Sequence, residues 1–403
     1  MRDVVVVAYG RTACCKSRKG SFAGVHPLEY SAQALKGTLA KIPQLKAEMI
    51  DDVVMGCAMP VNQMSMNFAR LCVNRAGLPD CVPAQTINRF CSGGLQAIAT
   101  GANAIWAGQM DVVVAGGCED MTDCFSPYPQ EYMDKWIMEN YEGGYMTMGE
   151  TAERVADKWN ISREEMDKMA LESHTRAAQA RLHGKLAPSI IPYTKEDGTV
   201  VDYDDVILAE MDGTLKTSME KMAGLKTCFV AAEDGGKVTA ATSSQTTDAA
   251  AYVMIMDSDY AAEHGIKPIA KMIAFQVAGC DATRMGMGPV YAIPKALKQA
   301  GFSSVKDMDV IELNEAFASQ AMACIKNVVK NPMLDGFQEM WDAKKVNPYG
   351  GAMALGHPMG ATGAFLTCKA LDYLRDPETA GKYGMVTMCI GGGMGAAGIY
   401  EML

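Results

Sequence analysis

The chain has 403 residues, of which 49% are apolar and 21% are charged, and its formal net charge is −10. This length predicts two or more packed units, and the composition excludes a disordered chain. The acidic charge, without a run of Lys and Arg, argues against a nucleic-acid binder and against contact with anionic membranes. The acidic net charge does not exclude an anionic small ligand that binds in a locally positive pocket.

The first 120 residues alternate β-branched runs with helical patterns. Strands are predicted at residues 4–8 and 111–115, and helices at residues 30–39 and 94–106. This alternation predicts an α/β unit built on a mainly parallel sheet.

Residues 121–240 lack this alternation. They contain clusters of Pro, Gly, Tyr and Met, followed by a charged helical stretch over residues 149–184, in which Ser162 and Glu165 form a capping-box pattern. We interpret this segment as an inserted loop domain that lies over the first α/β unit and its active site.

Strand patterns return in the last part of the chain. They fall at residues 251–257, 269–277, 385–390 and 397–400. Each α/β portion has a strand, a Gly-rich turn and a helix of small residues. We therefore predict that residues 1–120, completed by about residues 240–270, form one half, and that residues 271–403 form a second, duplicated half.

Thirteen cysteines without a C-x-x-C pair argue against a zinc site, so we predict no metal. So many thiols indicate a reducing compartment. The apolar run Val4–Tyr9 is too short for a signal sequence or a membrane span. We expect a cytoplasmic protein that does not contact a membrane.

One cysteine lies in a glycine-rich turn, in the segment NRFCSGGLQ at residues 88–96. A strand pattern precedes Cys91 and a helix of small residues follows it, so the thiol would lie near a helix N-terminus. The helix dipole and free N–H groups there favour a thiolate and a developing oxyanion. The alternative is a buried, inert cysteine.

Three further glycine-rich or strand-end segments carry reactive side chains. His357 lies in a Gly/Pro turn, as either a general base or a structural histidine. Cys389 ends a strand just before three glycines, which lack the Lys of a phosphate-binding loop. Asn314, with Glu315, follows the strand pattern 310–313, either as part of a site or as a helix N-cap.

Taken together, the four segments resemble the active-site motifs of the thiolase family. Three more segments follow the family's order: GGCEDM at residues 116–121, MGETAE at 148–153 and MGMGP at 285–289. The resemblance spans nearly the whole chain. It implies a fold of duplicated α/β halves in five layers, α-β-α-β-α, with an inserted loop domain.

The resemblance also implies a role for each reactive group. Cys91 is the nucleophile that carries the acyl group, and His357 activates it. Cys389 moves the proton at the carbon beside the thioester. Asn314 holds a water that, with His357, stabilises the thioester enolate, and the backbone N–H groups of Cys91 and Gly391 form a second oxyanion hole.

Six residues match family positions that contact coenzyme A (CoA) or the acyl group. They are Ser244, which meets the pantetheine arm, together with Met148, Phe229, Met285, Ala316 and Phe317. Ordinary core packing is the alternative for the apolar members. CoA is then a substrate, and no cofactor is expected to be permanently bound.

Four positions depart from the pattern of many relatives. Gly93 replaces Ser, Thr242 replaces Asn and Ala249 replaces Gly, while Thr147 stands where short-chain biosynthetic members often have His. Because of the first three, the details of the CoA pocket and the range of acyl chain lengths that the protein accepts are not fixed by the resemblance. Thr147 and the NRFC context favour the degradative type.

The resulting hypothesis is reversible, CoA-dependent cleavage of a 3-ketoacyl-CoA to acetyl-CoA and a shortened acyl-CoA. The alternatives are an acetoacetyl-CoA-specific acetyltransferase, a condensing enzyme that uses a carrier protein, and a non-catalytic acyl-CoA-binding homologue. The family also implies a homodimer or homotetramer, with a β-oxidation enzyme as a potential partner.

Overall fold

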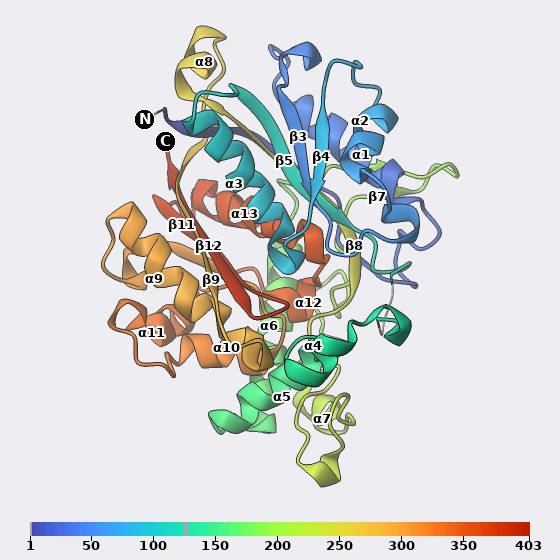
Figure 1. Ribbon diagram of the computed structural model, residues 1–403, viewed down its shortest axis with the longest axis vertical. Coiled ribbons are helices and arrows are strands. Elements are labelled where there is room, and N and C mark those ends of the chain that lie inside the picture. The colour runs from blue at the N-terminus through green and yellow to red at the C-terminus, as the bar shows by residue number, and fades with distance from the viewer. Residues whose placement is uncertain (1, 125–127) are drawn as a thin grey trace.

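The computed structural model describes residues 2–124 and 128–403 (Figure 1). Its main sheet has ten strands and two parts. In the first part the order is β4-β3-β5-β8-β1, and in the second it is β9-β12-β11-β10. The two parts join where β1 pairs with β9 through Val5–Lys271 and Val6–Ala270. None of the described helices is long and apolar enough to cross a membrane.

The strands of the first part come from both sides of the inserted segment. Their bounds are Val4–Arg11 (β1), Asp52–Gly56 (β3), Ala84–Ile87 (β4), Val112–Glu119 (β5) and Thr247–Asp257 (β8), and the short β2 (Cys15–Lys16) pairs with β8. β8 is fully buried between β1 and β5. A strand that follows the insertion therefore completes the sheet begun by the first 120 residues.

The strands of the second part are Ala270–Gly279 (β9), Val310–Leu313 (β10), Tyr383–Ile390 (β11) and Met394–Met402 (β12). The prediction of a mainly parallel sheet is wrong. β3 runs parallel to β4 and β5, and β10 runs parallel to β11, whereas β1, β8, β9 and β12 pair in the antiparallel direction. β8 lies between β1 and β5 and runs antiparallel to both, and β12 lies between β11 and β9 and runs antiparallel to both.

Two helices lie between the two parts of the sheet and form the central layer. They are α3 (Gly93–Trp106) and α13 (Met359–Arg375), which pack against each other. α1 (Pro27–Leu39) and α2 (Phe68–Arg75) cover the outer face of the first part, and α9 (Gly288–Ala300) covers the second (Figure 1). The five layers α-β-α-β-α are as predicted.

The central helices pack closely because their facing residues are small. Gly94, Gly363 and Ala364 lie where α3 crosses α13, and a side chain on Gly94 would come within 2.7 Å of the Ala364 nitrogen. Apolar residues of both parts of the sheet surround this crossing in one core. The crossing fixes the N-terminal ends of both helices relative to each other.

The regular structure of the inserted segment is mainly helical. It contains α4 (Lys135–Asn140), α5 (Met148–Lys158), α6 (Arg163–Leu182), α7 (Met219–Ala223) and the short strands β6 (Tyr193–Thr194) and β7 (Val200–Val201). The predicted helical stretch 149–184 is broken at residues 159–162, where Asn160 has a φ of 51°. The capping box of Ser162 and Glu165 then starts α6, as predicted.

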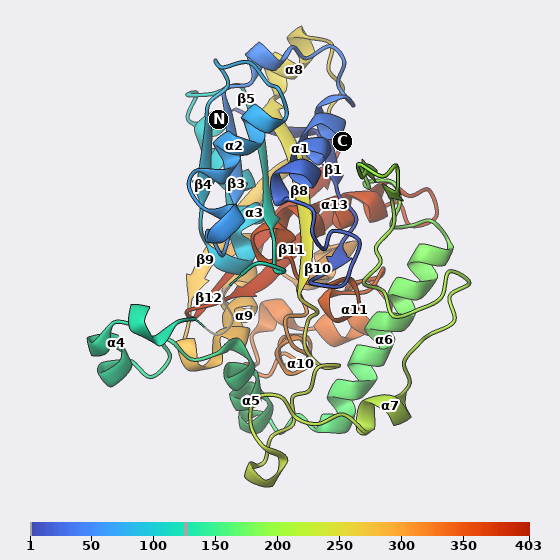
Figure 2. The ribbon, with the colours of Figure 1, turned by 90° about the vertical axis from the view of Figure 1, so that its right-hand side faces the viewer.

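This segment contacts both parts of the chain: the residues after α6 contact the first α/β unit, where Asp204 accepts hydrogen bonds from Arg11, and its helices contact the C-terminal part. α5 and α6 contact α10 (Ala318–Ile325), and α6 also contacts α12 (Ala352–Leu355) (Figure 2). The remaining helices are α8 (Ser258–Glu263) and α11 (Phe337–Asp342). The insertion thereby borders the loops that carry Asn314 and His357.

Candidate active site

Cys91 lies in the tight connection between β4 and α3. The connection is a single 3-10 turn, Phe90–Ser92, and Phe90 has a φ of 43°, which is an uncommon conformation for an aromatic residue. A side chain on Gly93 would lie 3.1 Å from the carbonyl oxygen of Gly360, so the turn sits directly against the start of α13. The predicted strand-to-helix elbow is confirmed, and Cys91 is 6% exposed.

The thiol of Cys91 is not an unassisted thiolate. Burial raises its pKa to about 11, and hydrogen bonds from the backbone N–H groups of Gly391 and Cys91 lower the pKa by less than burial raises it. The backbone donors favour the thiolate, as expected, but desolvation of the charged form outweighs them. Cys91 needs a base.

His357 lies between α12 and α13 in the glycine-rich loop. Its backbone N–H donates to the carbonyl oxygen of Gln245 at 2.9 Å. Its Nδ1 lies 2.6 Å from Oγ1 of Thr362, and its Nε2 lies 3.4 Å from Nδ2 of Asn314. Because the Asn314 amide nitrogen can only donate, Nε2 is the acceptor and Nδ1–H donates to Thr362.

The imidazole of His357 is a neutral base. Burial lowers its pKa to about 4, so the ring carries no charge at neutral pH. The acceptor Nε2 faces Asn314 in the interior, while Thr362 holds the opposite nitrogen. An uncharged, oriented imidazole can act as a general base for a group that reaches its Nε2.

Asn314 follows β10 and points into the same site. α10 begins at Ala318 with Phe317 as its N-cap, so the alternative that Asn314 caps a helix is wrong. Its side chain is 1% exposed, and Oδ1 has no partner among the described residues. A buried amide oxygen without a partner is the kind of group that a water or substrate satisfies.

Cys389 occupies the end of β11 and is fully buried. Burial raises its pKa well above the ordinary thiol value, and the neighbouring Cys91 adds to this effect. The chain then turns through Gly392 and Gly393, which have φ values of 79° and 82°. Glycine is required at these two positions, and the turn presents the N–H of Gly391 to Cys91.

Buried polar contacts hold the loop that carries His357. Glu315 accepts hydrogen bonds from Ser173 at 2.6 Å and from Asn347 at 2.8 Å. Lys369 forms a buried ion pair with Glu312 at 2.8 Å, and its Nζ donates to the Gly350 carbonyl at 2.6 Å. These contacts tie the strand end at Asn314 to the glycine turn before His357.

A cleft of about 540 Å³ opens beside this site. Ser244 and Phe229 line it, and Phe229 is 40% exposed. Other lining residues were not predicted from the sequence: Lys16, His174, Lys216, Thr217, Lys221, Gln245 and Met353. Gln245 connects the cleft to the base, since its carbonyl oxygen accepts the N–H of His357.

Three of the other predicted substrate contacts, Phe317, Ala316 and Met148, lie against residues of the cleft or of the glycine turn after Cys389. Phe317 packs edge-on against Phe229, with ring centroids 5.9 Å apart. The Ala316 carbonyl accepts the N–H of Ser244 at 2.9 Å, and a side chain on Gly391 would lie 3.5 Å from the Met148 sulfur. Met285 is 1% exposed and packs in the same apolar core as Cys389, so it lies behind the site.

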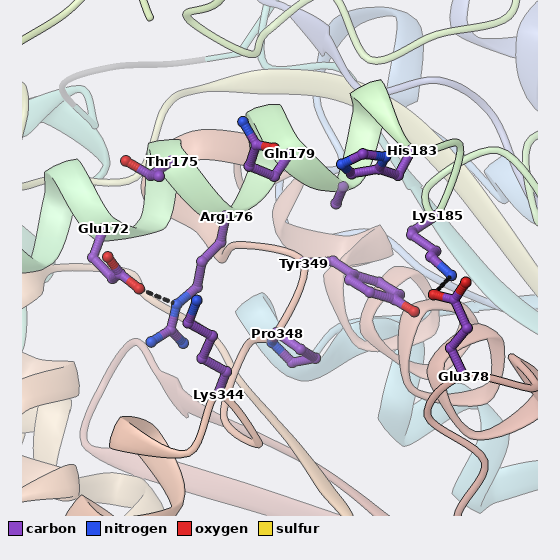
Figure 3. Close-up of a pocket in the computed structure, with 11 residues that line it drawn as sticks. Glu172, Thr175, Arg176, Gln179, His183, Lys185, Lys344, Pro348, Tyr349 and Glu378 are labelled. Atoms are coloured by element: carbon purple, nitrogen blue, oxygen red, sulfur yellow. Dashed lines mark hydrogen bonds and ion pairs between the residues drawn. The ribbon is translucent and has the colours of Figure 1, made fainter.

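A second cavity, of about 580 Å³, lies on the opposite face of α6. Figure 3 shows it bordered by Glu172, Arg176, Gln179, His183 and Lys185. It contains none of the predicted site residues, and several of its charged groups are paired, such as Arg176 with Glu172 and Lys185 with Glu378. Its size alone therefore does not mark it as the site of the chemistry.

Comparison with known proteins agrees with this arrangement. The family profile described as "Thiolase, N-terminal domain" matches residues 4–259, and the one described as "Thiolase, C-terminal domain" matches residues 266–402. The chain belongs to the thiolase family. The residues described above therefore occupy a thiolase fold, as the sequence motifs predicted.

Relatives of known name align over the full chain. A 3-ketoacyl-CoA thiolase of Bacillus subtilis is 40% identical over 408 residues, covering 100% of both chains. The peroxisomal 3-ketoacyl-CoA thiolase 1 of Arabidopsis thaliana is 37% identical, covering 99% of this chain and 87% of its own.

Solved structures of thiolases superpose closely. The dimeric peroxisomal thiolase of Saccharomyces cerevisiae matches with a TM-score of 0.89 and 32% identity, covering 100% of this chain and 98% of its own. An acetyl-CoA acetyltransferase of Bacillus anthracis matches with a TM-score of 0.86 and 33% identity, covering 100% and 99%. The two similar structures differ in their named activity.

Proposed function

We propose that this protein is a 3-ketoacyl-CoA thiolase, which cleaves a 3-ketoacyl-CoA with free CoA to give acetyl-CoA and a shortened acyl-CoA. The observations that support the proposal are the contact of Asn314 with His357, the proximity of Cys389 and Gly391 to Cys91, and the close approach of Gly93, beside Cys91, to Gly360 at the start of α13, just after His357. The full-length similarity to the Bacillus subtilis enzyme supports the substrate class.

The first half-reaction forms an acyl-cysteine. His357 Nε2 removes the proton of the Cys91 thiol, and the sulfur attacks the 3-keto carbon. The backbone N–H groups of Cys91 and Gly391 hold the oxyanion that develops there, and one such donor is typically worth about 3–4 kcal/mol. The bond between C2 and C3 then breaks, which leaves the shortened acyl group on Cys91.

The departing acetyl-CoA leaves as its enolate. Cys389 donates a proton to C2, while Asn314, through a water, and His357 donate hydrogen bonds to the enolate oxygen. In the second half-reaction the thiol of free CoA attacks the acyl-cysteine and returns the proton to the site. Splitting the reaction in this way replaces one difficult step with two easier ones and gives ping-pong kinetics.

CoA serves as a substrate and not as a bound cofactor in this proposal. The cleft beside the site supports it, because Ser244 and Phe229 lie along its wall and Lys16 and Lys221 supply positive charge for the phosphates. Met148, Ala316 and Phe317 would line the inner end, where the acyl group enters.

A narrower activity on acetoacetyl-CoA is the second candidate. It is favoured by the similarity to the Bacillus anthracis acetyl-CoA acetyltransferase. We also propose a homodimer, because the similar yeast thiolase is dimeric. Size-exclusion chromatography with light scattering tests this, and a monomer would overturn it. The predicted β-oxidation partner and the cytoplasmic location stay predictions.

Thiolysis assays test the function. The purified protein is mixed with CoA and with 3-ketoacyl-CoA substrates of four, six and more carbons, and loss of the 3-keto thioester absorbance is followed. Cleavage by the wild type but not by Cys91→Ala is the expected result, and activity at four carbons alone would support the narrower candidate. No turnover by the folded wild type, or turnover of carrier-protein thioesters instead, would overturn the proposal.

A further inference from the structure

Helix α6 separates the two cavities described above. Residues three or four positions apart share one helix face, so Glu172, Arg176 and Gln179 all border the outer cavity (Figure 3). His174 is two positions from Glu172 and from Arg176, which places it on the opposite face. It lines the cleft that holds Ser244 and Phe229.

His174 has an unmet hydrogen-bonding need. Its side chain is 2% exposed, and its Nδ1 has no hydrogen-bond partner among the described residues. Burial lowers its pKa to about 4, so the ring is neutral and offers one donor and one acceptor. A buried polar atom without a partner is unfavourable, and native proteins rarely keep one without a use.

We propose that His174 binds the pantetheine arm of the acyl-CoA substrate through a hydrogen bond to one of its amides. This inference rests on the proposed function. Two observations support the ligand chemistry. The cleft already holds lysines for the charged phosphates, whereas His174 is neutral, and a neutral donor and acceptor match an uncharged amide.

The position of His174 agrees with this role. Ser244 and Gln245 border the same cleft, and the preceding residue, Ser173, contacts Glu315 and the N–H of Gly351. His174 therefore lies on a helix that is fixed to the site by its neighbour. It is a binding residue that holds the substrate, and it has no part in moving protons.

Two variants separate binding from folding. His174→Leu fills the volume without a polar atom, and His174→Gln keeps a donor and an acceptor. The matched control is His183→Leu, since His183 is on the same helix but borders the outer cavity (Figure 3). The readouts are the Kd for CoA by calorimetry, KM and kcat for thiolysis, and the Tm without ligand.

We expect His174→Leu to raise the Kd and KM by about fivefold, the effect of one neutral hydrogen bond, with kcat within about twofold of the wild type. His174→Gln should recover most of the affinity, and His183→Leu should behave as the wild type. The Tm of unliganded His174→Leu should equal or exceed that of the wild type, because an unpaired polar atom has been removed. A purely structural histidine would lower the Tm instead.

Acetoacetyl-pantetheine, which lacks the nucleotide, tests whether His174 contacts the pantetheine arm. The same fold-change in KM with this thioester and with acetoacetyl-CoA is expected, and an effect confined to the full CoA thioester would overturn the assignment to the pantetheine arm. An active wild type with unchanged Kd and KM in His174→Leu would refute this inference alone. An inactive wild type would refute the proposed function.

Discussion

Glu119 joins the end of β5 to the first turn of α13, since its carboxylate accepts the N–H of Gly360 at 2.6 Å. The same carboxylate accepts the N–H groups of Ala58 at 2.7 Å and Met59 at 2.9 Å. Glu119 is fully buried, and besides these backbone donors the thiol of Cys57 lies 3.7 Å from its carboxylate. It lies within electrostatic reach of Cys91 and raises the pKa of that thiol.

Replacing Glu119 with Ala should lower the free energy of unfolding by about 3 kcal/mol or more, because three buried N–H donors lose their acceptor. Urea denaturation followed by circular dichroism measures this. Glu263→Ala, at an exposed position in α8, is the control and should change little. A Glu119→Ala protein as stable as the wild type would show that the carboxylate does not hold these loops together.

The reactivity of Cys91 should depend on pH in two ways. Above pH 4 the neutral His357 accepts the thiol proton, so alkylation by iodoacetamide should reach a plateau, and it should fall as pH drops through about 4, the pKa of His357. A further rise should begin only toward pH 11, where the thiol ionises unaided.

Peptide-resolved mass spectrometry measures the alkylation of Cys91, with the exposed Cys81 in the same digest as the reference. His357→Ala should remove the plateau and keep the alkaline rise. An acid limb near pH 6.5 in the wild type would contradict a desolvated, neutral His357.

Thr362 should set the tautomer of His357. Thr362→Val removes the acceptor that lies 2.6 Å from Nδ1 and should lower kcat about 3- to 10-fold, as expected for one neutral hydrogen bond, with little change in KM. Thr362→Ser keeps the hydroxyl and should retain most of the activity. Equal kcat values for the Val and Ser variants would rule this role out.

Asn314→Ala should lower kcat by about 100- to 1,000-fold, the usual effect of losing one oxyanion donor, while the affinity for CoA stays unchanged. Steady-state kinetics and calorimetry give the two values. Formation of the acyl-enzyme from a 3-ketoacyl-CoA should slow by a similar factor, because the enolate that Asn314 stabilises departs in the first half-reaction. Rapid-quench mass spectrometry measures the rate of acyl-enzyme formation, and an unchanged rate would show that Asn314 does not stabilise the enolate.

His174 should also affect stability in acid. Its folded-state pKa of about 4 lies below the ordinary 6.5, so the unfolded chain binds more protons between these values and stability falls as pH drops through this window. In His174→Leu the slope of unfolding free energy against pH should be shallower by about one proton. Urea titrations at pH 4.5, 5.5 and 6.5 test this, and identical slopes would contradict a neutral, buried His174.

The sequence predicted the parts of the site that depend on short segments. The turn at Cys91 and the glycines after Cys389 are local features, because a short run of neighbouring residues determines each of them. Thr362 could have been found by the same means, since it lies five residues after His357 in the first turn of α13.

Long-range contacts escaped prediction. Glu119 lies in the segment GGCEDM, but no role was predicted for it, and His174 resembled an ordinary helix residue; the significance of both comes from burial, and that of Glu119 also from partners far along the chain. Burial likewise reverses the expected pKa shift of Cys91. The prediction of strand direction was wrong for a related reason. The direction of β8 relative to β1 and β5 depends on which strands become its neighbours, and those strands lie far away in the sequence.

The nucleophile and its partners come from opposite ends of the chain. Cys91 is made early, whereas the strand that carries Cys389 and the final strand that pairs with it are made last. At about 5–20 residues per second, the ribosome needs tens of seconds to cover that interval. Because α13 must also enter the central layer, the nascent chain carries a thiol without its base or proton donor until synthesis is nearly complete. Premature chains released by the ribosome would therefore lack the groups with which Cys91 catalyses thiolysis.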